Sequence, residues 1–332
     1  MEKNRRISFL EPHRSEYEIE RDQMEKILSQ KKIVKHNNFC PVKRDVIQKI
    51  VHFNTKYRDN FYNTSSSDFK YNFPLPVNNV VSMRLRSLDI PNTWYTFSEN
   101  RGNSKFIIEV KTRRTDLQIF EIIIPDGNYN AVQLCNYLNN TYLYQSGITN
   151  NLNYIKINVS EINLKTQFQI VRKPPIGFKF NLKFITTANK PLIYSTGWLL
   201  GFRSAEYINI SQDIESEGLF DAGGDRYIYI SLEDFNKSRN DNNIIFLDKT
   251  YIDKDIIGKM YLHDGKFNVN ISDNDAESNV KKRVFMGPVD IKTIKIKLLD
   301  EYGNNVHLNN MDWSFSLEFD ILYKKNINNY SR

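Results

Sequence analysis

Large apolar side chains alternate with small or charged ones near the C-terminus, and this pattern constrains the fold more than any other feature of the chain. On one side of the alternation stand Trp313, Phe315, Leu317, Phe319, Ile321 and Tyr323. Only a β-strand places every second residue on one face. Each of these side chains contributes roughly 1.5–3 kcal/mol when it is buried. We therefore expect a core strand of a large sheet, with Phe315 and Phe319 in the interior of a central strand.

Period-two alternation recurs in short segments separated by turn-forming residues. With 313–323, the predicted strands are 80–88, 105–110, 119–124, 154–159, 168–171, 178–184, 226–232 and 291–299. One helix is expected at 131–144, capped by Asn128 or Asn130 and ended by Gly147. Segments 208–224 and 236–282 are polar and long, and we expect them to be surface excursions. Many strands joined mostly by loops predict an all-β antiparallel sandwich with large insertions and one short helix.

Residues 1–52 differ from the rest and are expected to form a basic N-terminal arm. Segment 15–29 is rich in Glu, Lys, Arg and Gln and predicts a short surface helix. The first fifty residues hold twelve Lys or Arg and eight Asp or Glu, a net +4 of the chain's +7. The candidate assembly or anion contacts of this arm are Lys31, Lys32, Lys35, Lys43, Arg44 and Lys49. Such an arm either binds a neighbouring subunit, the reading we prefer, or neutralises nucleic-acid phosphates.

Other chemistry finds little support in the sequence. Cys40 and Cys135 form no CxxC pair, and the acidic stretch from Asp273 lacks the glycine and the final acid of a calcium loop. Gly223 and Gly224 precede a predicted strand rather than a helix, which indicates a turn and not a phosphate loop. No hydrolase motif is present, and no apolar run approaches the length of a membrane helix. We therefore expect no enzyme activity, no cofactor, no metal and no transmembrane segment.

Three groups of motifs resemble, in this order, those of capsid-associated proteins of nucleocytoplasmic large DNA viruses, the penton and minor capsid proteins. The first group is Tyr57-Arg58-Asp59-Asn60, Ser66-Ser67-Asp68-Phe69 and Leu88-Asp89-Ile90-Pro91-Asn92-Thr93-Trp94-Tyr95. The second is Ile124-Pro125-Asp126-Gly127-Asn128-Tyr129 and Gly197-Trp198-Leu199-Leu200-Gly201-Phe202. The third is Phe285-Met286-Gly287-Pro288-Val289-Asp290-Ile291, Leu298-Leu299-Asp300-Glu301-Tyr302-Gly303 and Leu308-Asn309-Asn310-Met311-Asp312-Trp313-Ser314-Phe315.

This resemblance implies a jelly-roll sandwich at 53–325, followed by a tail at 326–332. One elaborated jelly roll is preferred, and two are the alternative. The implied role is a virion structural protein, a minor capsid or penton component made in the host cytoplasm. Its implied partners are other capsid proteins or further copies of the chain, with possible nucleic-acid contact through the arm. Two other functions remain open: a basic DNA-associated virion protein, and a carbohydrate-binding β-sandwich in which Trp94, Trp198 and Trp313 would line a groove.

Overall fold

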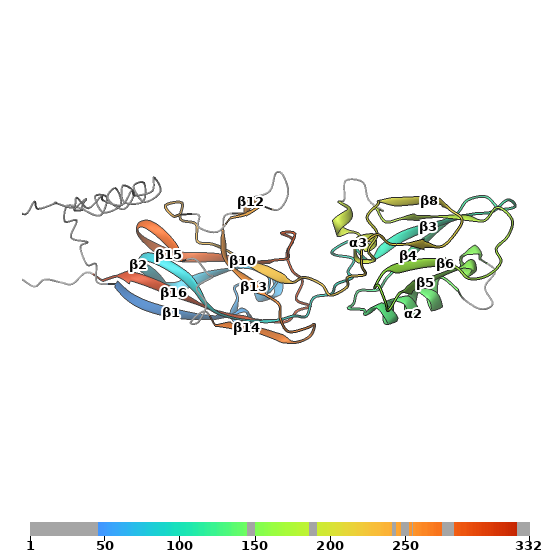
Figure 1. The fold of residues 1–332 in the computed structure, drawn as a ribbon. Helices are drawn as coiled ribbons and strands as arrows, with labels where there is room; N and C mark the ends of the chain where they lie inside the picture. The colour runs from blue at the N-terminus through green and yellow to red at the C-terminus, as the bar shows by residue number, and fades with distance from the viewer. Residues whose placement is uncertain are drawn as a thin grey trace, which may run out of the picture. The chain divides into compact units, whose positions relative to one another are not determined.

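The strands form two groups (Figure 1), and each group encloses its own large cluster of buried hydrophobic side chains. The computed structural model describes residues 46–144, 150–185, 191–240, 244–246, 252–253, 255–273 and 282–323. Val46–Leu322 forms one compact unit. Every pairing between its named strands is antiparallel. The fold class is therefore confirmed as an all-β, antiparallel sandwich of jelly-roll type with insertions.

The first group is a seven-stranded sheet in the order β1-β16-β2-β15-β10-β13, with β14 also paired to β2. Its strands are β1 (Val46–Asn54), β2 (Asp68–Pro91), β10 (Tyr227–Glu233), β13 (Ile256–Tyr261), β14 (Val269–Asp273), β15 (Arg283–Leu299) and β16 (Ser314–Leu322). The long pair β2–β15 has register shifts between Val284 and Thr293. On one side of these shifts β2 pairs with β16 and β14, and on the other side it pairs with the second half of β15.

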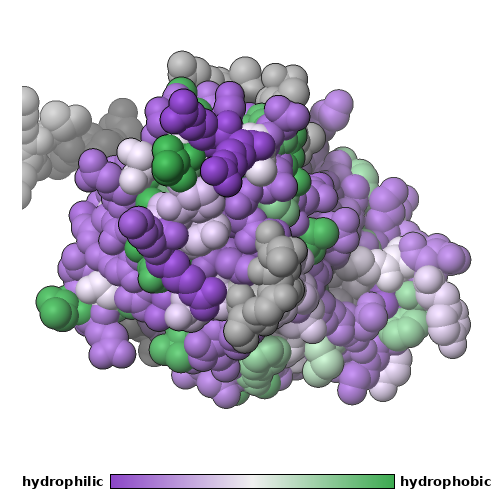
Figure 2. Space-filling view, turned by 90° about the vertical axis from the view of Figure 1, so that its right-hand side faces the viewer, coloured by the Kyte–Doolittle hydropathy of each residue, from purple (hydrophilic) through white to green (hydrophobic). Residues whose placement is uncertain are grey.

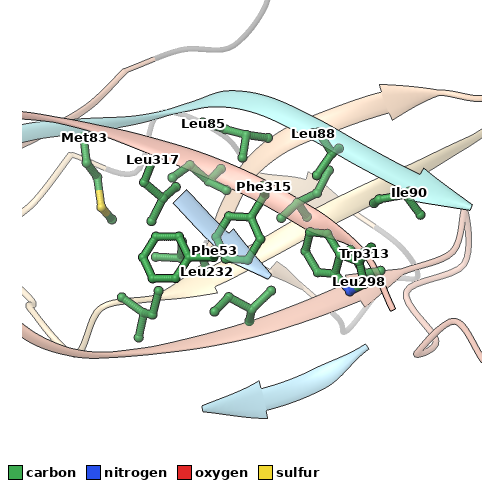
Figure 3. Packing of buried hydrophobic residues seen from close by; sticks show 14 of the residues in the cluster. Phe53, Met83, Leu85, Leu88, Ile90, Leu232, Leu298, Trp313, Phe315 and Leu317 are labelled. Carbon is green, nitrogen blue, oxygen red and sulfur yellow. The ribbon is translucent and has the colours of Figure 1, made fainter. Parts of the chain in front are cut away.

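The sheet consequently folds over itself into two layers that enclose the first core. Figure 3 shows Leu85 of β2 and Phe315 of β16 on one side of this core and Leu298 of β15 on the other. Phe53 of β1 stacks on Phe315 with ring centroids 4.7 Å apart and meets Tyr71 edge-on at 5.2 Å. Phe315 is 3% exposed and Phe319 is fully buried. Because β16 lies between β1 and β2, the prediction that both residues are core residues of a central strand is confirmed.

The second group lies entirely between β2 and β10 in the chain. One sheet has the order β4-β3-β7-β8 and the other β5-β6-β9. Their strands are β3 (Lys105–Lys111), β4 (Gln118–Ile123), β5 (Ile155–Val159), β6 (Thr166–Ile170), β7 (Lys179–Lys183), β8 (Glu206–Ile210) and β9 (Ile214–Glu215). Phe106, Phe168, Phe180, Phe184 and Phe202 fill its core. This core is separate from the first because each group buries its own inward-facing residues.

Helix α2 (Ala131–Thr141) follows the sequence prediction closely. Asn130 accepts a hydrogen bond from the Gln133 amide, while the Gln133 side chain accepts one from the Asn130 amide. This reciprocal pair satisfies two of the otherwise unpaired amides at the helix start. Leu134, Cys135 and Leu138 form the buried face. A one-turn helix, α3 (Thr196–Leu199), was not predicted; it is capped by the Ser195 hydroxyl.

The strand prediction was incomplete in several places. Residues 46–52, assigned to the arm, belong to β1, so the expected boundary at residue 52 falls within a strand. Two segments expected to be surface excursions contain strands of the sheets. The end of β8 and all of β9 lie in 208–224, and β13 and β14 lie in 236–282. The remaining short elements are β11 (Ile245–Phe246), β12 (Ile252–Asp253) and the 3-10 turns η1 (Thr55–Tyr57), η2 (Phe61–Asn63), η3 (Asn151–Tyr154) and η4 (Leu192–Tyr194).

Candidate assembly surface

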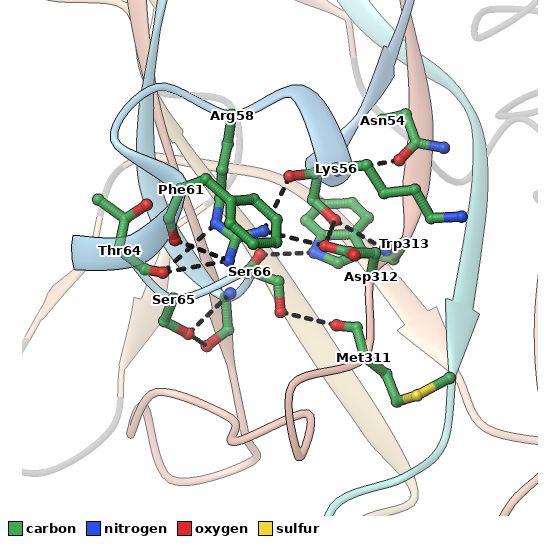
Figure 4. Close-up of polar contacts among 12 residues, drawn as sticks. Asn54, Lys56, Arg58, Phe61, Thr64, Ser65, Ser66, Met311, Asp312 and Trp313 are labelled. Carbon is green, nitrogen blue, oxygen red and sulfur yellow. Dashed lines mark hydrogen bonds and ion pairs between the residues drawn. The ribbon is translucent and has the colours of Figure 1, made fainter.

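Two of the motif groups come together at the end of β1 (Figure 4). The Arg58 guanidinium donates to the Asp312 carboxylate at 2.9 Å and to the Thr55 carbonyl at 2.9 Å. It also donates to the carbonyls of Phe61 and Thr64 and lies 4.0 Å from the centre of the Phe61 ring. The Arg58 side chain is 9% exposed. A charged group this buried is stable because its donors are satisfied by a carboxylate and several carbonyls.

The same hydrogen-bond network, which we call the Arg58–Asp312 network, fixes Trp313 directly before β16. The Trp313 indole donates to the Ser66 carbonyl at 2.6 Å, and its backbone amide donates to the Thr55 hydroxyl at 2.9 Å. That hydroxyl in turn donates to Asp312 at 2.8 Å. Segments about 250 residues apart in sequence are thus fixed to each other, which gives the resembling motifs a structural role. The Arg58–Asp312 network therefore fixes the Asn54 end of β1 to β16.

Strand β1 itself is an exposed edge. It pairs with β16 in continuous register from Val46↔Leu322 to Asn54↔Ser314, and within the described residues its other edge has no strand partner. Val46, Ile47 and Ile50 are 45%, 50% and 46% exposed. Since neighbouring strand residues point to opposite faces, both faces of this stretch are open to solvent. An edge of nine residues with exposed apolar side chains is a template for pairing with another chain.

Val46 and Leu322 lie at the end of the β1–β16 pair that is opposite to the Arg58–Asp312 network. Val46 is opposite Leu322 in the β1–β16 register, so residues 1–45 lead directly into β1 and the C-terminal residues continue directly from β16.

The second face of β16 is also buried, which the alternation did not predict. Ser316, Glu318 and Asp320 are 3–6% exposed although they point away from the hydrophobic core. Glu318 accepts from Arg84 at 2.7 Å and lies 3.5 Å from an Arg86 nitrogen. Asp320 accepts from the Ser82 hydroxyl at 2.6 Å and forms an ion pair with Lys282. Burial lowers the pKa of Lys282, and the nearby Arg84 adds to this lowering, while Glu318 opposes it.

Of the predicted arm contacts, Lys49 lies in the described part of the chain. It is exposed on β1, opposite Phe319. Lys31, Lys32, Lys35, Lys43 and Arg44 lie outside the described residues, and so does Cys40. Cys135 is buried, and burial raises the pKa of its thiol to about 11, which keeps it protonated and unreactive at neutral pH.

The other candidate sites have structural explanations. Gly224 has φ +84° and is followed by β10, which agrees with a turn rather than a phosphate loop. A Cβ on Gly224 would lie 2.8 Å from Lys266 Cε, so the backbone approaches that side chain closely. Asp273 ends β14, and the remainder of the acidic stretch lies outside the described residues.

The part of the chain that the structure describes has no arrangement typical of a metal site or of a membrane-spanning helix. No group of three or more His, Cys, Asp or Glu side chains in it is arranged to hold a metal ion. None of its helices is long and apolar enough to cross a membrane. On the face shown in Figure 2 the surface is mainly hydrophilic, and its hydrophobic residues form separate spots. Scattered apolar residues of this kind are normal for a protein surface.

Comparison with known proteins gives structural neighbours and no sequence relatives. No family model matches the sequence, and no curated protein matches it. The solved mavirus penton protein is similar over 83% of this chain and 99% of its own, with 10% identity and a TM-score of 0.44. A chain of the Sputnik virophage structure is similar over 83% of this chain and 97% of its own, with 10% identity and a TM-score of 0.37.

Proposed function

We propose that this chain is a structural protein of a virus particle, a minor capsid or penton component located in the virion, and that it acts through assembly contacts rather than catalysis. The observation that carries the proposal is the edge of β1. It is fixed at one end by the Arg58–Asp312 network and exposes Val46, Ile47 and Ile50. Its partner is a strand of another capsid protein or of a second copy. The motif resemblance supplies the viral context.

The separate cores support a finer proposal about domains. Each group of strands buries its own hydrophobic cluster, so we propose two sandwich domains, with the second inserted between β2 and β10. This replaces the single elaborated jelly roll that was preferred from the sequence. Residues 1–45, which precede β1, form the basic arm in this proposal, and residues 326–332 form the tail.

Substitution on the β1 edge tests the assembly role. Ile50 lies opposite Glu318 in the strand register, so a lysine at position 50 keeps an acidic neighbour and the fold should be retained. We expect Ile50→Lys to give a folded protein that no longer enters particles when it is co-expressed with the other capsid proteins. Ile119→Lys is the matched control, because Ile119 is 62% exposed on the edge strand β4. Normal incorporation of Ile50→Lys would refute a contact at this edge.

Deletion of residues 1–45 separates assembly from nucleic-acid binding. We expect the shortened chain to fold and to be excluded from particles. Incorporation at the normal level, combined with loss of a salt-dependent affinity for DNA, would instead assign the arm to the genome.

A further inference from the structure

A cavity of about 430 Å³ opens beside the turn that follows β15 and beside α3. This volume falls within the roughly 300–1,000 Å³ that is typical of small-molecule sites. Four aromatic side chains line it, together with a set of charged and amide groups. The aromatic residues are Tyr194, Trp198, Tyr227 and Tyr302. Such a combination of ring faces and polar groups can bind a ligand that has both apolar and hydrogen-bonding surfaces.

The most buried charged groups of the cavity are paired with each other. Arg101 donates to Asp225 at 2.7 Å and to Asp300 at 3.0 Å, and both carboxylate side chains are less than 5% exposed. Asp225 also accepts from the Trp94 indole at 2.7 Å. The amides of Tyr302 and Asn304 donate to Asp300. This cluster fixes the turn at Tyr302, and its one arginine and two carboxylates carry a net charge of −1.

The remaining charged groups of the lining are also partnered. Arg203 stacks 4.0 Å from the centre of the Trp198 ring and donates to the Trp198 carbonyl at 3.0 Å. Arg226 lies 3.6 Å from the Asp221 carboxylate, and its backbone amide donates to Glu301. An anionic ligand would have to compete with these carboxylates for the arginines. A metal ion would have to compete with the arginines for the carboxylates. The lining therefore favours a neutral polar ligand.

We propose that this cavity binds a neutral saccharide. The apolar C–H face of a sugar ring packs on an aromatic side chain, while its hydroxyls exchange hydrogen bonds with amide and carboxylate groups such as Asn304 and Glu301. Tyr302 is the ring assigned to this contact, and Trp198, with Arg203 over one of its faces, lines the cavity beside it. Trp94 and Trp313 take no part, because they are 2% and 3% exposed and their indoles donate to Asp225 and to the Ser66 carbonyl. The site is independent of the assembly role proposed for β1.

Saturation-transfer NMR on the full chain tests the site with lactose and N,N′-diacetylchitobiose as neutral probes and 3′-sialyllactose as a charged one. We expect transfer to at least one neutral disaccharide, and about tenfold weaker binding in Trp198→Ala and Tyr302→Ala, a loss of about 1.4 kcal/mol. Tyr62→Ala is the control, because Tyr62 is 96% exposed and lies outside the lining.

Circular dichroism shows which variants are folded, and Tyr302→Ala decides the test if Trp198→Ala does not fold. Absence of transfer to both neutral sugars would overturn the proposal. Binding restricted to the sialylated sugar, or neutral binding that the folded cavity variants leave unchanged, would overturn it too.

Discussion

Loss of the Arg58–Asp312 pair should destabilise the fold far more than loss of a surface ion pair. Arg58 is 9% exposed and Asp312 is 19% exposed, so removal of one partner leaves a largely desolvated charge. Breaking such a pair costs about 3–5 kcal/mol when it is fully buried. Because Asp312 retains some solvent contact and Arg58 keeps its carbonyl acceptors, we expect Asp312→Ala to lower the free energy of unfolding by about 2–3 kcal/mol.

A double-mutant cycle with Arg58→Met isolates the pairwise part of this effect. Urea unfolding followed by far-UV circular dichroism gives the four free energies, and we expect a coupling of about 1.5–3 kcal/mol. The control cycle uses Lys105 and Glu121, which lie 3.3 Å apart but are 45% and 51% exposed, so that their coupling should be about 0.2–1 kcal/mol. Faster amide hydrogen exchange along β1 in Asp312→Ala would show that the Arg58–Asp312 network stabilises this strand. Equal coupling in the two cycles would refute the reasoning.

Two further predictions concern the first core and a buried lysine. Phe319→Ala should cost about 3–5 kcal/mol in chemical unfolding, whereas Tyr323→Ala, at a residue 53% exposed, should be nearly neutral; a loss below about 1 kcal/mol for Phe319→Ala would contradict a central position of β16. Burial lowers the pKa of Lys266 to about 8, an effect opposed by Asp225 and increased by Arg101. Between that value and the ordinary pKa of about 10.4 the unfolded chain binds more protons, so this group makes stability rise with pH. Unfolding of the wild type and of Lys266→Met from pH 8 to 10 should show this rise in the wild type alone, and parallel curves would contradict it.

The strands with clean alternation could be predicted, and the edge strand could not. In β1 the apolar residues Val46, Ile47, Ile50, Val51 and Phe53 fall on both faces, because the first part of the strand is exposed on both sides. Period-two alternation appears when one face of a strand is buried and the other is solvated, a condition that β1 does not meet. Strands β13 and β14 were missed because polar segments surround them in the sequence. The arm residues named as candidate contacts remain a prediction, apart from the position of Lys49 on β1.

The cavity proposed to bind a saccharide could not be predicted for a different reason. Its lining comes from segments near residues 101, 198, 226 and 302, which are distant in sequence and joined by tertiary contacts. The apolar neighbours of Trp198 in the sequence favour burial of its ring, whereas the structure leaves it half-buried and lining the cavity. The burial that the alternation predicts for Trp313 is correct, and Trp94, for which no burial was predicted, is also buried. No local pattern distinguishes these three environments, because burial depends on which segments pack around each ring.

The buried carboxylates on β16 explain why this strand keeps a single register with β1 and β2, although part of β1 is exposed to solvent. A slip of one residue would turn Glu318 and Asp320 into the hydrophobic core and would turn Phe319 outward. It would also separate Glu318 from Arg84 and Asp320 from Ser82, which leaves charges buried without partners. The polar face thus opposes the slip as strongly as the apolar face does. Since β1 pairs with β16 alone in the described part of the chain, the position of the proposed assembly edge is determined by this register.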